Sequence, residues 1–189
     1  MDWRRVQRIL SAEAGVGEPT LRRRFGSKEE LIAEVFHDKV AAYADEAERA
    51  LGDPDTWRGF TTFIHAVTRM QLEDRGFTDV LTMTFPESMR AEVHRRRAYT
   101  AVGKLIGRAQ AEGTLRSDFS PEDIVLLLMA HAGVVAAAGA LLPAFSDRLL
   151  AYFLEVFAAP GGGMLPAAPS AASTYRALLG LHRSQPKRT

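Results

Sequence analysis

Apolar residues recur along most of the chain at intervals of three and four residues, the spacing of one face of an α-helix. The strict alternation of apolar and polar residues that marks a half-buried strand is nearly absent. The pattern therefore predicts an all-α protein. We expect helices over residues 3–13, 18–24, 27–51, 57–76, 86–109, 121–142 and 145–157.

Residues typical of helix ends support several of these boundaries. Gly113 follows one predicted helix, at a position where a left-handed residue commonly ends it. Ser27 is followed three residues later by Glu30, the spacing of a capping box. Ser120 and Pro121 combine a capping side chain with a proline in the first helical position. These signals predict that new helices begin after Ser27 and at Pro121.

The chain has no formally charged residue between Asp123 and Asp147, a stretch that includes most of the helix predicted over residues 121–142. The stretch IVLLLMAHAGVVAAAGALL is long enough to span a bilayer, and the alternative is a helix buried on all sides. We favour the buried helix, because the stretch is rich in Ala and Gly, contains His131 and lacks flanking basic clusters or aromatic belts. No membrane association is therefore expected.

Composition narrows the possible functions. The 189 residues contain no cysteine, which excludes disulfides, thiolate chemistry and cysteine zinc sites. The histidines have no i, i+4 ligand partner, so no metal site is expected. No catalytic triad, glycine-rich phosphate loop or carboxylate pair stands out, and we expect neither an enzyme nor a cofactor. The opening MDWRRVQRIL lacks the apolar segment of a signal peptide, which predicts a cytoplasmic protein.

The net charge is only +1, but it is unevenly distributed. Residues 1–28 carry seven Arg or Lys against three Asp or Glu, whereas residues 29–50 carry two against seven. A basic patch beside an acidic helix is typical of a surface that meets phosphates.

The basic patch coincides with two short predicted helices joined by a glycine-containing turn, the anatomy of a helix-turn-helix. Such a unit places a polar second helix in the DNA major groove, and apolar residues hold it from behind. Residues suited to the inner side are Val16, Leu21 and Phe25. Residues suited to the outer side are Thr20, Arg23 and Arg24. A run of arginines is usually a solvated helix face, but the turn residues and the capping box favour DNA binding here.

At these residues the sequence AGVGEPTLRRRFGSKEELIAEVF resembles the recognition segment of the TetR family of transcriptional regulators. The matching residues are Ala14, Gly15, Val16, Thr20, Leu21, Phe25, Ser27, Lys28, Glu29 and Leu31. The resemblance covers residues 3–51, whereas the helical remainder resembles the family in length and layout only. It implies DNA contacts by Gly17, Thr20, Arg22, Arg23, Arg24 and Lys28.

Three features depart from the family pattern. Arg22 stands where the family usually has Tyr, and a phosphate contact survives that change. Glu18 replaces a Lys or small polar residue; an acid there would weaken backbone affinity or accept a hydrogen bond from cytosine. The family has a further helix before the one that begins here at Trp3. We therefore expect a shortened DNA-binding unit that lacks most or all of that first helix.

Aromatic and methionine residues gather around the short segment 77–85. Such a set is more often plain core, but it also suits an adaptable apolar cavity for a small apolar or amphipathic effector. His131 is either a satisfied core histidine or a ligand contact. The candidate ligand-binding residues are Trp57, Phe60, Phe63, Val67, Met70, Met83, Met89 and His131.

Three parts of the chain are expected. Residues 1–51 hold the helix-turn-helix and a connecting helix, residues 52–158 a helical regulatory and dimerisation domain, and residues 159–189 a flexible linker and tail. The resemblance implies a homodimeric, ligand-responsive repressor that binds a near-palindromic double-stranded operator. The alternatives are a helical dimer that has lost DNA binding and acts as an interaction protein, and an all-α enzyme.

Overall fold

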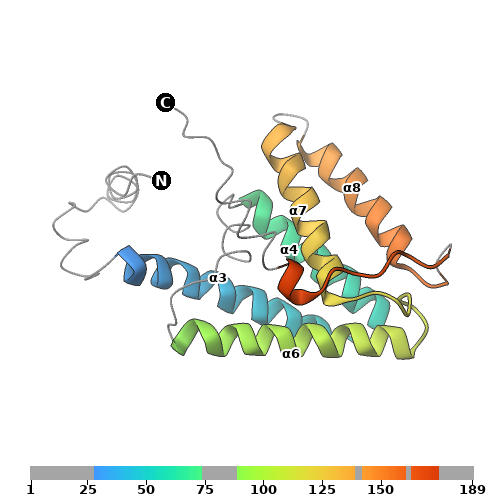
Figure 1. Cartoon of the computed structure of the whole chain (residues 1–189), viewed down its shortest axis with the longest axis horizontal. Coiled ribbons are helices and arrows are strands. Elements are labelled where there is room, and N and C mark those ends of the chain that lie inside the picture. Colours follow the sequence, from blue (N-terminus) through green and yellow to red (C-terminus); the bar gives the residue numbers. More distant parts are fainter. Residues whose placement is uncertain (1–27, 74–88, 139–141, 161–162, 175–189) are drawn as a thin grey trace.

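The computed structural model describes residues 28–73, 89–138, 142–160 and 163–174, and within these ranges the protein is built from helices (Figure 1). The long helices are α3 (Lys28–Leu51), α4 (Thr56–Glu73), α6 (Met89–Ala111), α7 (Pro121–Ala137) and α8 (Leu142–Phe157). The predicted all-α class is confirmed. The helices predicted over 3–13 and 18–24, like the segment 77–85, lie outside the described residues.

Local signals placed most helix starts correctly. The helix predicted after Ser27 is α3, and α7 begins at Pro121. The backbone N–H of Ser120 donates to the Asp123 carboxylate at 2.8 Å, which caps the first turn of α7. Gly113 has a φ of 69°, the left-handed conformation expected of a glycine that ends a helix.

The structure corrects two predicted boundaries, the end of the helix over residues 121–142 and the start of the helix over residues 145–157. α7 ends at Ala137, where the N–H of Ala138 still donates to the Val134 carbonyl. α8 begins at Leu142 rather than Phe145, because proline is tolerated in a first helical turn and Pro143 does not prevent it. No helix in the described part of the chain combines the length and apolar character needed to cross a membrane.

The helices pack as two sets around one core. α3 and α6 lie side by side and run in the same direction, while α7 and α8 form an antiparallel pair (Figure 1). α4 lies between the two sets and contacts α3, α6 and α7. Gly59 permits its close approach to the end of α3, since a Cβ there would lie 2.6 Å from the Ala50 carbonyl oxygen.

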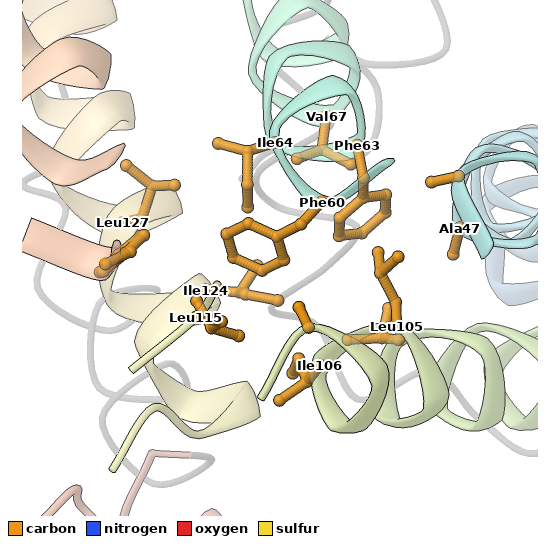
Figure 2. Packing of buried hydrophobic residues seen from close by; sticks show 14 of the residues in the cluster. Ala47, Phe60, Phe63, Ile64, Val67, Leu105, Ile106, Leu115, Ile124 and Leu127 are labelled. Atoms are coloured by element: carbon orange, nitrogen blue, oxygen red, sulfur yellow. The ribbon is translucent and has the colours of Figure 1, made fainter. Parts of the chain in front are cut away.

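The core is centred on the buried face of α4. Phe60, Phe63 and Ile64 are fully buried and meet Leu105 of α6 and Leu127 of α7 (Figure 2). Each such side chain contributes roughly 1.5–3 kcal/mol through burial. The ring of Phe60 also makes an edge-to-face contact with Phe119, at 5.3 Å between centroids.

The segment after α8 is fastened to the loop between α6 and α7. Arg116 is buried and donates to the carbonyl oxygens of Val156 and Gly163, while its side chain pairs with Asp118. This guanidinium holds the pKa of Asp118 well below its usual range. The N–H of Leu165 also donates to Asp118, so the predicted linker is anchored to the bundle at Gly163 and Leu165.

Candidate functional site

A cavity of about 230 Å³ opens between α3, α6 and α7. Its lining residues recur at helical spacing, so one stripe of each helix faces the same space. The lining consists of Val40 and Tyr43 from α3, Arg95, Ala98, Tyr99 and Val102 from α6, and Pro121, Ile124, Val125 and Leu128 from α7. α3 is the helix that directly follows the predicted DNA-binding segment, and it supplies one wall.

The cavity has an apolar floor and a polar rim. Buried aliphatic side chains, among them Val40, Ile124 and Leu128, form the floor. Tyr99 is 75% exposed and Arg95 is half-buried, and both belong to the rim. Arg95 is the one charged residue among the described residues that line the cavity. The site therefore suits an apolar molecule with one polar or anionic end.

Tyr43 connects this cavity to the core. Its ring lies edge-on to Phe63, with 5.4 Å between the ring centroids. Burial raises the pKa of the Tyr43 hydroxyl, because the phenolate would lose its hydration. The hydroxyl therefore stays protonated at neutral pH.

His131 lies one turn beyond Leu128 and is fully buried. Its Nδ1 lies 2.7 Å from Gln71 Oε1 and its Nε2 lies 2.9 Å from Ser146 Oγ. Gln71 Nε2 donates to the Leu128 carbonyl, so Gln71 Oε1 is the acceptor that faces the imidazole. His131 Nδ1 must then donate and Nε2 accept from Ser146. A neutral imidazole joins α4, α7 and α8 directly behind the cavity wall, and burial lowers the pKa of His131.

The residues predicted to bind a ligand fall into separate places. Phe60, Phe63 and Val67 are fully buried in the core, and Trp57 stacks on Phe60 at 5.7 Å. None of them lines the cavity. Met70 is half-buried on α4. Met83 and the side chain of Met89 lie outside the described residues. A ligand role for this set stays a prediction.

The predictions from sequence did not include the residues that do line the cavity. Tyr43 lies at an apolar position of the helix predicted over residues 27–51, and Arg95 stands in a run of three arginines. A signal was present in the spacing of Arg95, Ala98, Tyr99 and Val102, which places them on one face of α6. What that face meets depends on α3 and α7, which periodicity alone does not give.

The predicted DNA-binding residues precede the described part of the chain. Gly17, Thr20 and Arg22–Arg24 lie outside it, and Lys28 is the first residue of α3 with its side chain not described. Their assignment to DNA contacts remains a prediction. The structure does describe how α3 is held further along.

α3 is fixed to α6 by an ion-pair cluster around Arg97. The guanidinium binds Glu48 at 2.6 Å and Asp45 at 2.9 Å, both on α3. Arg97 also contacts His94 Nδ1 at 2.9 Å, and the ring of His94 lies edge-on to His37 of α3. The hydrogen bond from Arg97 lowers the pKa of Glu48. Among the described residues, no group of three or more His, Asp or Glu side chains could hold a metal ion.

α7 and α8 leave apolar side chains exposed on their outer side. Leu126, Phe145 and Tyr152 are each exposed by more than half, and Val156 by 48%. A shallow hollow of about 360 Å³ lies between Val134 of α7 and the Phe145–Tyr152 face of α8. The described residues of this one chain therefore do not bury α7 on all sides, and its complete burial stays a prediction that needs a further partner. The helix is apolar all round, but only one of its faces meets α4 and α8.

Residues 53–155 match the family model described as "Transcriptional regulator SbtR-like, C-terminal domain". This stretch is more than half of the chain, and the chain belongs to the TetR family of transcriptional regulators. The fold is similar to that of the TetR family transcriptional regulator PfmR from Thermus thermophilus, with a TM-score of 0.55 and 18% identity over 84% of this chain and 86% of that chain. None of the curated protein sequences matches this chain. The predicted family and the class of DNA-binding, helix-turn-helix transcriptional regulators are thereby confirmed.

Proposed function

We propose that this regulator is a ligand-responsive repressor that acts as a homodimer on a near-palindromic operator. The observation that carries the proposal is the shared wall of the cavity. Val40 and Tyr43, which line it, stand on the helix that leads directly from the predicted recognition segment. A ligand in the cavity would touch that helix, so ligand binding and DNA binding would be linked.

In this proposal the helix around Thr20–Arg24 enters the major groove. Arg22 and Lys28 hold phosphates, and Arg23 and Arg24 read base edges. The basic charge of residues 1–28 supports this assignment, since phosphate contacts dominate DNA affinity.

The exposed apolar side chains of α7 and α8 support the homodimer. Monomeric soluble proteins rarely leave contiguous apolar surface of this kind uncovered, and such surface usually marks an interface. In a two-fold dimer the same face would pack against itself. The two recognition helices would then stand at a fixed spacing, which the operator half-sites must match.

In this proposal, ligand binding would affect DNA binding through the packing of α3 on α6. The Arg97 ion pairs with Asp45 and Glu48 make these two helices move together. A ligand that separates α3 from α7 would tilt this pair, and the recognition helices would leave the operator spacing.

Selection of bound DNA from a random pool, followed by titrations over a salt series, tests the proposal. We expect an enriched inverted repeat and an affinity that falls steeply with salt. Arg22→Ala should flatten that dependence, whereas Arg24→Ala should relax preference at one base pair by about 1–3 kcal/mol. If no sequence is enriched and binding is absent at low salt, the repressor proposal fails. The alternative of an interaction protein without DNA binding is then favoured.

A further inference from the structure

We infer that the C-terminal tail, residues 175–189, docks within its own chain on the cavity between α3, α6 and α7. The tail is then the built-in occupant of that cavity, and an effector has to displace it. The regulatory consequence rests on the function proposed above. The docking itself does not, because it can be measured without DNA.

The segment that precedes the tail leads from the end of α8 toward the cavity. We call this segment the C-terminal strap, and its described residues are 158–160 and 163–165. The N–H of Leu165 donates to the Asp118 carboxylate at 3.1 Å, three residues before Pro121, which lines the cavity. Figure 1 shows the strap in red, running from the end of α8 past the start of α7. The chain is therefore held close to the α7 wall of the cavity.

A helical turn over residues 171–174 follows the strap, and Ser170 caps it. The Ser170 Oγ accepts a hydrogen bond from the N–H of Ser173 at 3.2 Å. Residues 163–172 are exposed, whereas Thr174 is half-buried and its Oγ1 is buried. The six residues from Leu165 to the start of this turn span at most ~22 Å. The described chain thus turns back against the protein at Thr174, within reach of the cavity.

The sequence of the tail predicts an amphipathic helix that would continue this turn. Tyr175, Leu178, Leu179 and His182 follow one another at the spacing of a single helical face. The buried Thr174 comes directly before this stripe. Such a stripe is stable in water only when it is covered. The buried aliphatic floor of the cavity, which includes Val40, Ile124 and Leu128, offers that cover.

Charge favours the same placement. The tail carries four Arg or Lys and no Asp or Glu, whereas residues 29–50 carry seven acids against two bases. Most of that acidic stretch is α3, which supplies one wall of the cavity. Asp38 is exposed on α3 two residues before Val40. A basic tail is attracted to such a wall, and this complementarity favours the chain's own tail as the occupant.

A docked tail would influence the position of α3. α3 packs mainly on α6 and α4, so the cavity lies where α3 has few direct contacts with α7. A helix seated there adds packing on that side and favours one placement of α3 over others. It also lowers the apparent affinity of any other ligand by the fraction of chains in which the cavity is filled. Removal of the tail should therefore strengthen ligand binding.

Binding of the apolar dye 1-anilinonaphthalene-8-sulfonate tests this consequence. A chain that ends at Thr174 should bind the dye on the order of tenfold tighter than the full chain, if the tail fills the cavity in about nine chains of ten. Leu178→Asp in the full chain should have the same effect, because it places a charge on the apolar stripe. Ala177→Asp is the matched control on another side of the predicted helix and should bind the dye like the wild type.

One further variant assigns the gain in dye binding to the cavity. Val125 is half-buried on the α7 wall, and Val125→Asp places a negative charge beside the anionic dye. In the chain that ends at Thr174, this change should abolish the gain. Equal dye affinity of the full and shortened chains, or a gain that Val125→Asp does not alter, would overturn the docking.

Cross-linking tests the placement directly, and the absence of native cysteine makes introduced thiols unambiguous. Arg183→Cys in the tail is combined with Tyr99→Cys, since Tyr99 is 75% exposed at the cavity rim. A short bismaleimide should join the two thiols within one chain in high yield, and Leu178→Asp should lower that yield. The control pair uses Arg69→Cys, which is exposed on α4 outside the cavity lining. Equal yields for the two pairs would refute the placement.

The DNA readout is kept separate. Operator affinity of the full chain tests the proposed repressor function, whereas dye binding and cross-linking without DNA test this inference. If shortening the chain at Thr174 raises dye affinity and also changes operator affinity, both are supported. If it raises dye affinity only, the docking is supported and its regulatory role is overturned. If it weakens DNA binding and leaves dye affinity unchanged, the tail contacts DNA instead, and the docking is overturned.

Discussion

Gln71 on α4 and His131 on α7 share a buried hydrogen bond of 2.7 Å, in which the imidazole Nδ1–H donates to the amide oxygen. Ser146 on α8 completes the network at the other ring nitrogen. Three helices thus meet at one neutral histidine, and both ring nitrogens have a partner. Satisfied buried polar networks of this kind fix the relative placement of the elements that they join.

Replacing the histidine should therefore destabilise the bundle. His131→Leu leaves Gln71 Oε1 and Ser146 Oγ buried without their partner, at a cost of about 1–3 kcal/mol for each unsatisfied group. Urea unfolding followed by circular dichroism measures the loss. His65→Leu is the matched control, because His65 is exposed on α4 and should change stability by less than about 0.5 kcal/mol. Equal effects of the two substitutions would contradict the structural role of the network.

The same histidine predicts a pH dependence of stability. Burial lowers the pKa of His131 in the folded state, so the unfolded chain binds more protons between the two pKa values. The His131 contribution is at its full value above about pH 6.5, the ordinary histidine pKa. It should decline as the pH falls from there to the folded pKa and stay level below it. The difference between wild type and His131→Leu, measured by unfolding at several pH values, should narrow over this range.

Replacement of glycine by alanine should have opposite effects on stability at Gly59 and at Gly103. Gly59→Ala forces a Cβ against the Ala50 carbonyl oxygen and should destabilise the protein by about 1–3 kcal/mol. Gly103→Ala meets nothing within 4 Å on the exposed side of α6 and should stabilise it by about 0.5–1 kcal/mol. Thermal melts of the two variants test this, and a stable Gly59→Ala would show that α4 and α3 do not approach as closely as described.

Charges on the outer face of α7 and α8 should break the homodimer. Leu126→Glu and Tyr152→Glu each place a carboxylate on the exposed apolar surface, where self-association would have to remove it from water. Sedimentation velocity at micromolar concentration should show a dimer for the wild type and monomers for both variants. Tyr99→Glu serves as control, since Tyr99 is also exposed but lies on α6 beside the ligand cavity. A wild type that sediments as a monomer would end the dimer proposal.

The Arg97 ion pairs should affect operator affinity more than they affect the free energy of unfolding. Arg97 and Glu48 are both partly exposed, and such ion pairs contribute little to the free energy of folding. Arg97→Ala should leave the melting temperature nearly unchanged, because α3 stays packed on α6. It should alter operator affinity, because the ion pairs between these two helices are lost. Glu48→Ala should have a smaller effect in the same direction, because Arg97 keeps its ion pair with Asp45, and the double variant should not exceed the effect of Arg97→Ala. Additive effects on DNA affinity would show that the two residues act independently.

The sequence by itself determined the helices of this protein. Capping by Asp123 at the start of α7 and the left-handed Gly113 after α6 are interactions within a few residues. Local sequence suffices to predict them for that reason. The spacing of residues in the basic segment likewise predicted a recognition helix and indicated the TetR family. The family match over residues 53–155 then confirmed that family.

Only the tertiary structure decided which faces of these helices meet. α7 is apolar on every side, so its pattern did not reveal that His131 faces the core while Leu126 faces outward. Likewise, the aromatic side chains of α4 could have lined a cavity, but the fold buries Phe60 against Phe119, which is distant in the sequence, and leaves the open space beside Tyr43. Burial depends on partners that are distant in the sequence, whereas helix formation depends on neighbours. The sequence therefore predicted the helices but not the cavity between α3, α6 and α7.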